Sequence, residues 1–382
     1  MLGEPKISTL ADLFVGELAD VGNWVVANVR SGVAWPLRVQ AVDFRGHRIF
    51  LVPRSASTVV ADGSTITHYP FAAVNMPAGT EFKVGRRLLS HFLSSLSWDE
   101  GAGITVEHWT GGSRAHPMGQ SRMGGVVIDQ LELEYLPDPT DERVRWALAF
   151  YREGLSLYRD NVAYATLSFF KVLNIVANNG PKQITWVNAN IARFGTTNLL
   201  QFELKKRLDE LRLAGITDIG EYLYASGRCA VAHAGTDPTV DPENPEDIER
   251  LLKDLPLTRA MAALVIEIEL GVKSRHTIWD EHLYELTGFR ELLGETLATR
   301  LKERDTTVKP EELTTLLHRI SVRIKDHATY DGLENLTVKA ISVGDGRVHL
   351  TATSDSNVVS IRFVLDFPSE RIVFDFGNDL QA

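Results

Sequence analysis

The residues best suited to catalysis are an arginine and a histidine, Arg228 and His233, within residues 227–235. Histidine exchanges protons readily near neutral pH, and arginine holds a phosphate in a bidentate fork that is always charged. RNA cleavage without a metal requires a base for the 2′-hydroxyl, an acid for the leaving oxygen and a cation beside the phosphate. The pair therefore predicts such chemistry, with His233 as general acid and base and Arg228 as the phosphate clamp.

The spacing of the pair limits how the two side chains can meet. Five residues along an ideal α-helix turn by about 140°, so the side chains would leave a regular helix in different directions. Either the last turn is distorted near Gly235, or the site combines residues from two chains. A third interpretation is structural: His233 caps exposed carbonyls at a helix C-terminus, and Arg228 forms a salt bridge.

The surrounding segments predict a helical bundle over residues 141–272. Apolar residues recur at helical spacing in 141–159, whereas 162–176 is apolar on every side, as in a helix at the centre of a bundle. A third helix carries three leucines at helical spacing: Leu204, Leu208 and Leu211. The bundle would thus bring at least three helices against the one that carries the pair.

The helix that carries the pair is expected to begin near Asp218, a residue suited to an N-cap. Gly235 is expected to end it, because glycine is common just past a helix C-terminus. The final pair of bundle helices is expected to be split by Pro256, since proline interrupts helical hydrogen bonding.

Two further domains are predicted beside the bundle. Residues 1–138 contain short segments rich in β-branched and aromatic residues, with one helix around 88–96, and so predict a β-rich domain. Residues 273–382 predict a helical region followed by a four-strand antiparallel meander, because apolar residues alternate strictly near the end. The fold class is therefore α+β and multidomain.

One long glycine-rich loop in the N-terminal domain, residues 111–125, carries Arg114, His116 and Arg122. Loops of this length are often functional, so these three residues are candidates for contact with a ligand or RNA. The loop does not match the phosphate-binding pattern, because the final Lys-Ser/Thr pair is missing.

Composition limits the class of protein. A chain of 382 residues predicts two or three domains. Its net charge of −10 argues against a surface built throughout for nucleic acid, while a local basic cleft stays compatible. The single cysteine, Cys229, excludes an intramolecular disulfide and fits a reducing cytoplasm. With no membrane-spanning segment, metal-ligand spacing or cofactor motif, we expect a soluble cytoplasmic protein without metal or cofactor.

The Arg228/His233 spacing resembles the R-x4-6-H motif of HEPN domains, helical bundles common among prokaryotic toxins and phage-defence ribonucleases. The resemblance implies a HEPN-like central bundle, an RNA substrate, a homodimer with two motifs facing each other, and an antitoxin or phage trigger as partner. In many active HEPN ribonucleases the residue after the arginine is polar, often asparagine, whereas here it is Cys229. A supporting carboxylate is expected on the first bundle helix, where Glu153 is the candidate.

A second resemblance covers roughly the middle third of the chain. Residues 150–157, 164–175 and 228–233 are similar to the bacterial family named methylamine utilization protein J. This similarity includes packing residues as well as the motif, so it bears on the fold more than on activity. The leading expectation is a metal-independent endoribonuclease with a toxin or antiviral defence role. The alternative is a non-catalytic HEPN-like scaffold that binds a nucleotide or a partner.

Overall fold

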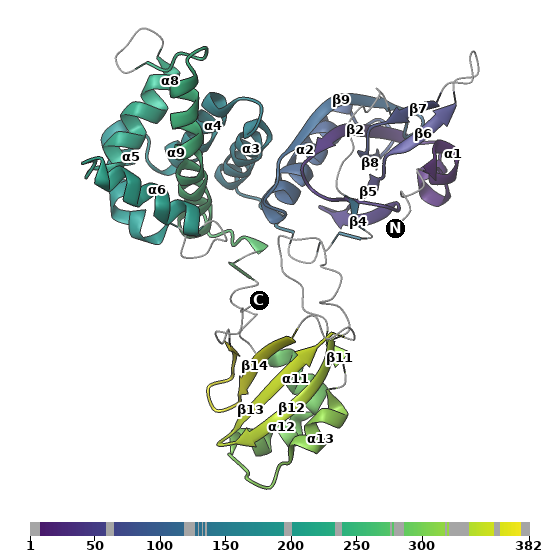
Figure 1. The fold of residues 1–382 in the computed structure, drawn as a ribbon. Coiled ribbons are helices and arrows are strands. Elements are labelled where there is room, and N and C mark those ends of the chain that lie inside the picture. Colours follow the sequence, from purple (N-terminus) through teal and green to yellow (C-terminus); the bar gives the residue numbers. More distant parts are fainter. Residues whose placement is uncertain are drawn as a thin grey trace. The chain divides into compact units, whose positions relative to one another are not determined.

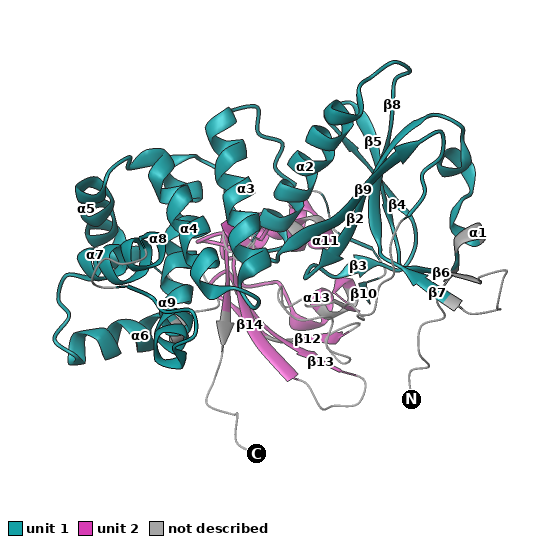
Figure 2. Ribbon diagram, turned by 90° about the horizontal axis from the view of Figure 1, so that it is seen from above, with its two compact units in different colours: residues 1–275 teal, residues 276–382 magenta. Residues whose placement is uncertain are grey.

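The computed structural model describes residues 8–58, 65–117, 127–128, 130–131, 133, 136–194, 201–233, 239–275, 277–278, 286–317, 319–320, 336–354 and 360–375. The chain divides into two compact units, residues 1–275 and residues 276–382 (Figure 2). The first unit contains a β-rich N-terminal part and a helical part, and the second contains an antiparallel sheet with helices. The mixed α and β composition and this order of elements confirm the coarse prediction.

The N-terminal part is built on a five-stranded antiparallel sheet with strand order β4-β5-β8-β2-β9. The strands are β2 Asn23–Ser31, β4 Gln40–Phe44, β5 His47–Val52, β8 Phe71–Met76 and β9 Ile104–Gly112. Successive side chains of a strand point to opposite faces, and on β2 the residues Val25 and Ala27 pack in one core with helix α2, Phe82–Asp99. Trp24 and Val26 belong to the core on the other face. The sheet is therefore covered on both sides.

Short elements complete this part of the chain. They are β1 Ser8–Thr9, α1 Leu10–Leu13, the 3-10 helix η1 Gly16–Ala19, β3 Trp35–Pro36, β6 Ser55–Thr58, β7 Thr65–His68 and β10 Val127–Ile128. Strands β1, β6 and β7 form one small sheet, and β10 pairs with β3 in another. The predicted helix around residues 88–96 is confirmed as the central part of α2.

Ten helical segments among the described residues form the helical part of the first unit. They are α3 Glu142–Leu157, α4 Val162–Val176, α5 Gly180–Asn190, the 3-10 helix η2 Ile191–Arg193, α6 Gln201–Leu213, α7 Ile219–Tyr222, α8 Ala230–Ala232, α9 Pro245–Leu264 and the π-helix η4 Val265–Glu269, with a second π-helix, η3 Leu223–Cys229, between α7 and α8. Helices α2, α3, α4 and α9 follow one another from the sheet into this part (Figure 1). Phe169, Val172 and Leu173 of α4 are completely buried, which confirms α4 as the central helix.

The prediction that Pro256 splits two helices is wrong, because α9 runs unbroken from Pro245 to Leu264. Proline removes the hydrogen bond to the carbonyl four residues earlier, here that of Leu252. Leu252 is 47% exposed and Pro256 is partly exposed, so this part of the helix borders solvent. Leu255 and Leu257 on either side of the proline are completely buried, and their packing holds the helix together.

The β-rich and helical parts of the first unit pack closely at α2, α3 and the start of β9. Trp98 of α2 meets Tyr151 of α3 edge to face, with ring centroids 5.1 Å apart. A buried ion pair joins Arg275, after the last helix, to Asp99 at the end of α2. At Gly103, a β-carbon would lie 2.6 Å from the backbone carbonyl carbon of Leu155. The contact between the two parts thus requires glycine at position 103.

We expect Gly103→Ala to destabilise the first unit by about 1–3 kcal/mol, the usual cost of forcing an extra methyl into a close contact. The neighbouring atoms belong to the backbone of α3 and cannot rotate away. Urea unfolding followed by tryptophan fluorescence measures this. The matched control is Gly46→Ala, where a β-carbon would meet nothing within 4 Å and the only penalty is the positive φ of 71°. Equal free energies of unfolding for Gly103→Ala and wild type would contradict the close contact.

The second unit contains helices α11 Thr287–Leu293, α12 Glu295–Lys302 and α13 Pro310–Leu316 and the strands β11 Arg319–Ile320, β12 Leu336–Gly344, β13 Arg347–Thr353, β14 Ser360–Asp366 and β15 Arg371–Asp375. The strands pair in sequence order, all antiparallel. The predicted meander is confirmed, with β11 as an additional fifth strand. Val348, Leu350 and Ala352 of β13 face the core, which Leu313 of α13 shares.

Candidate functional site

A π-helix leads into the Arg228/His233 pair. Asp218 is the N-cap of α7, where its side chain accepts a hydrogen bond from the Glu221 backbone at 2.8 Å, as the sequence predicts. The chain continues as the π-helix Leu223–Cys229 and then as one turn of α-helix, α8. π-Helical turns are wider than α-helical turns and occur frequently at functional sites. The element that carries Arg228 is therefore irregular, as the spacing of the pair requires.

The structure brings the predicted pair together within one chain. Arg228 Nη1 lies 3.2 Å from His233 Nε2. His233 is the C-cap of α8 with extended backbone angles, φ −125° and ψ 93°, while its amide still donates to the Cys229 carbonyl at 3.0 Å. In a regular helix the two side chains would point about 140° apart. Here the wider π-helical turn before Arg228 and the extended backbone at His233 allow them to meet. Gly235, the predicted end of this helix, lies outside the described residues.

The geometry has a consequence for the protonation of His233. A guanidinium can only donate hydrogen bonds, so in this arrangement Nε2 of His233 is the acceptor and a neutral ring carries its proton on Nδ1. His233 is exposed and Arg228 is partly exposed. The ring nitrogen that contacts the guanidinium therefore lies at the surface, beside a permanent positive charge.

Tyr224 completes the surroundings of Arg228. The guanidinium carbon of Arg228 lies 5.6 Å from the Tyr224 ring centroid, within the range of a cation–π contact. A hydrogen bond with the Cys229 thiol, followed by burial, raises the pKa of Tyr224. The Tyr224 ring also lies against Gly180, where a β-carbon would be 2.6 Å from the ring. Tyr224 was not predicted as a site residue, although its position one turn before Arg228 was a usable signal.

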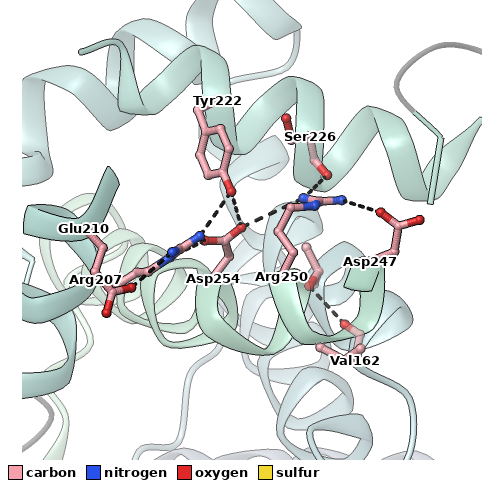
Figure 3. Close-up of polar contacts among 9 residues, drawn as sticks. Val162, Arg207, Glu210, Tyr222, Ser226, Asp247, Arg250 and Asp254 are labelled. Atoms are coloured by element: carbon pink, nitrogen blue, oxygen red, sulfur yellow. Dashed lines mark hydrogen bonds and ion pairs between the residues drawn. The ribbon is translucent and has the colours of Figure 1, made fainter. Parts of the chain in front are cut away.

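A group of polar contacts around Asp254 joins α6, α7 and the π-helix to α9 (Figure 3). Asp254 of α9 is 4% exposed in its side chain and accepts hydrogen bonds from Tyr222 Oη at 2.7 Å and Arg207 Nε at 2.8 Å. Arg250, one turn earlier on α9, donates from Nη1 to the Ser226 carbonyl at 2.8 Å. This carbonyl lies inside the π-helix, two residues before Arg228.

The charges of this group compensate each other. Burial raises the pKa of Asp254, while the hydrogen bond from Tyr222 and the charge of Arg207 oppose that rise. Burial also raises the pKa of Tyr222, and the neighbouring Asp254 carboxylate raises it further. Arg250 Nη1 lies 3.9 Å from Asp254, so one carboxylate stands between two guanidinium groups. Asp254 is therefore the central acceptor that holds α6, α7 and α9 together.

The predicted supporting carboxylate, Glu153, lies elsewhere on α3. Its ion-pair partner is Lys171 of α4 at 3.9 Å, and both side chains are about half exposed. Lys171 Nζ also lies 5.0 Å from the Phe150 ring centroid. Among the contacts of the described residues, none joins Glu153 to Arg228 or His233. A chain of printed contacts instead runs from the Asp254 carboxylate through Arg250 to the Ser226 carbonyl, two residues before Arg228.

The predicted ligand loop belongs to the N-terminal part, after β9. Arg114 is exposed and donates to the Ala19 carbonyl at 3.1 Å. His116 is exposed, and its carbonyl accepts from the Thr110 hydroxyl at 3.0 Å. Arg122 lies outside the described residues. No contact of the described residues connects this loop with the Arg228/His233 pair.

The described residues offer neither a metal site nor a membrane-spanning helix. In these ranges, no group of three or more His, Cys, Asp or Glu side chains could hold a metal ion. No helix in the same part of the chain is long and apolar enough to cross a lipid bilayer.

Comparison with known proteins gives one match. Residues 147–267 match the model of the family described as methylamine utilization protein MauJ. No curated protein and no solved structure matches the chain. The matched segment begins in α3 and ends in the π-helix η4, so it contains the Arg228/His233 pair, Tyr224 and Asp254. The helical part of the first unit therefore resembles the methylamine utilization protein MauJ family.

Proposed function

We propose that this protein is a metal-independent endoribonuclease of HEPN type that acts as a homodimer. The observation that carries the proposal is the 3.2 Å contact between Arg228 Nη1 and His233 Nε2 at an exposed helix end. A HEPN-like central bundle is part of the proposal. It is supported by the R-x4-6-H spacing and by the irregular helix that brings Arg228 and His233 into contact. A role as a toxin or in phage defence, with an antitoxin or a phage trigger as partner, follows from the same resemblance.

In the proposed reaction, His233 Nε2 accepts the proton of the ribose 2′-hydroxyl, and the 2′-oxygen forms a bond to phosphorus. The bond from phosphorus to the 5′-oxygen breaks, and that oxygen takes a proton from a second acid. Arg228 binds the non-bridging oxygens and compensates the charge that develops on them. The products are a 2′,3′-cyclic phosphate and a 5′-hydroxyl. In a homodimer with facing motifs, His233 of the other copy would supply the second proton.

The test is incubation of purified protein with a mixed tRNA and mRNA pool in the presence of EDTA. We expect cleavage that survives EDTA and leaves 5′ ends that a polynucleotide kinase labels without prior phosphatase treatment. Sedimentation at several protein concentrations measures the homodimer in the same preparation. Cleavage that stops with EDTA, or 5′ ends that need phosphatase first, would contradict the proposed mechanism.

A second candidate function is a non-catalytic HEPN-like scaffold that binds a nucleotide or a partner. It is favoured by Cys229, whose sulfur lies 3.7 Å from Arg228 Nη1. A thiol is a weak hydrogen-bonding group and a poor substitute for an amide that orients a ribose or phosphate. Cys229→Asn separates the two functions: a gain of cleavage would mean that the natural chain has a catalytic pair weakened at this position.

A further inference from the structure

A second cluster of positive charge lies far from the Arg228/His233 pair, where α2 and α3 pack against the turn between β4 and β5. Its members are Arg45 of the turn, Arg87 and His91 of α2, and Arg145 and Arg152 of α3. Arg87 and His91 are one helical turn apart, and Arg145 and Arg152 are two turns apart, so each pair shares one face of its helix. The chain as a whole carries a net charge of −10, so this basic junction is a local exception.

Arg45 is fixed at the centre of the basic junction. It occupies a left-handed turn position with φ 53°, which is uncommon for a residue other than glycine. Its Nη1 lies 2.7 Å from His91 Nδ1, and its Nε pairs with Asp138 Oδ1 at 2.5 Å. Its Nη2 donates to the Pro139 carbonyl. The Arg45 side chain is 22% exposed, so these bonds hold it in a partly buried position that still reaches solvent.

Two arginines of α3 reach the same junction. Arg145 donates to the carbonyl of Thr140, the residue after the Pro139 that Arg45 contacts. Arg152 donates to the carbonyl of Ser90, the residue before His91, at 3.1 Å. Backbone carbonyls therefore hold both guanidinium groups, and the charge of Arg145 acts on the His91 ring.

The described residues balance only part of the positive charge of the basic junction: Asp138 acts on Arg45 and His91, and Glu153 acts on Arg152. Asp138 pairs with Arg45, but the described residues place no carboxylate within ion-pair distance of Arg87, Arg145 or Arg152. Burial lowers the pKa of Arg152 to about 10. Burial, followed by the charge of Arg45, lowers the pKa of His91 to about 4. Gathering cations in a partly buried place costs free energy, and a bound anion would recover much of it.

We propose that the basic junction binds a phosphate group, carried either by a nucleotide or by a nucleic-acid backbone. Guanidinium groups recognise phosphate oxygens with paired hydrogen bonds, and a phosphate has enough acceptors for several arginines that converge from three elements. The site joins the β-rich part of the first unit to α3, which begins the helical part. The proposal does not depend on ribonuclease activity, since it involves neither Arg228 nor His233.

Binding is tested by calorimetric titration of the full chain with inorganic phosphate, with ATP and with a short single-stranded RNA. The variants are Arg87→Gln, at an exposed position, and Arg145→Gln. Arg212→Gln, exposed on α6, is the charge-matched control. The RNA titration uses the Arg228→Ala background, so that binding at the candidate active site does not mask the result. We expect both junction variants to weaken binding about tenfold and the control to bind as the parent protein does.

Each outcome decides a point. Loss of ATP binding in the junction variants identifies a nucleotide as the source of the phosphate, and loss of RNA binding alone identifies the backbone of a nucleic acid. Binding of inorganic phosphate alone supports an anion site that does not recognise the rest of a nucleotide. Failure of all three ligands to bind the parent protein, or equal binding by both junction variants, would overturn the proposal.

Titration of His91 provides an independent prediction about the same junction. The charged groups that face it are Arg45, Arg145 and Arg87, which lower its pKa, and Asp138, which raises it. NMR titration of the free protein should give a pKa of about 4, and Arg45→Ala should raise that pKa while burial keeps it below 6.5. Because the folded-state pKa lies below the ordinary one, the stability contributed by neutral His91 is fully present above pH 6.5. It is lost as the pH falls through about 4.

The NMR signal of His91 is assigned by its absence in His91→Gln. If this signal titrates near 6.5, the ring is not held neutral by its surroundings. Saturating phosphate should raise the pKa of His91 if the anion binds beside it, since a nearby negative charge favours the protonated ring. An unchanged pKa with bound phosphate would place the anion elsewhere.

Discussion

Arg228→Ala and His233→Ala are each expected to abolish metal-independent RNA cleavage while leaving the fold intact. Removing a general acid–base group commonly lowers the rate by about 10²–10⁴-fold, and removing one group that stabilises developing charge costs about 10²–10³-fold. His233 is exposed and Arg228 is partly exposed, and neither belongs to the apolar core. The double variant should be no slower than the slower single variant, because the two side chains act as one unit.

The measurement compares single-turnover cleavage rates of the variants with EDTA present. His349→Ala is the matched control, because His349 is an exposed histidine on β13 of the second unit. Arg228→Lys keeps the charge but loses the bidentate fork, so it should retain only part of the activity. Circular dichroism and thermal unfolding confirm that each variant is folded. Wild-type rates in both alanine variants would end the catalytic assignment.

The long helices were predictable because their apolar residues repeat with the period of the element. The predicted segment 162–176 coincides with α4, and 141–159 differs from α3 by one or two residues at each end. The alternation in the last part of the chain likewise located four of the five strands of the second sheet. In α3 and the strands the apolar period marks the one face that is buried, whereas α4 was located by an apolar run on every side, as expected for a central helix.

The irregular elements escaped prediction because their causes are not local. The π-helix Leu223–Cys229 is stabilised by a hydrogen bond from Arg250 on another helix to the Ser226 carbonyl. Helix α5 begins with a Gly180-Pro181 pair that is typical of a loop, yet Asn179 caps it and the proline occupies its first turn. Both cases depend on tertiary contacts or on capping details that override the average behaviour of the residue types.

The same limit applies to the candidate site. The spacing of Arg228 and His233 predicted the two candidate catalytic side chains, but it left open whether one chain could bring them together. The answer depends on Asp254, which is 26 residues from Arg228 along the chain and carries no catalytic signature of its own. A buried aspartate is informative only once its partners are known, because isolated charges are almost never buried unless they are paired.

Asp254→Ala is expected to lower the free energy of unfolding of the first unit by about 3–5 kcal/mol, the usual cost of removing one partner of a buried ion pair. Arg207, which is 15% exposed, would lose its best acceptor, and the Tyr222 hydroxyl would lose its only partner among the carboxylates of the described residues. Asp209→Ala is the matched control, because Asp209 also pairs with an arginine of α6, Arg212, but is 50% exposed. Exposed pairs contribute about 0–1 kcal/mol.

Urea unfolding followed by tryptophan fluorescence reports on the first unit, because six of the seven tryptophans precede residue 276. A loss in Asp254→Ala no larger than in Asp209→Ala would show that the buried group is not a structural centre. Arg250→Met then separates stability from activity, since it removes the donor to Ser226 but leaves Asp254 with Arg207 and Tyr222. If the π-helix positions Arg228, this variant should lose most of its cleavage rate at urea concentrations where it is still fully folded.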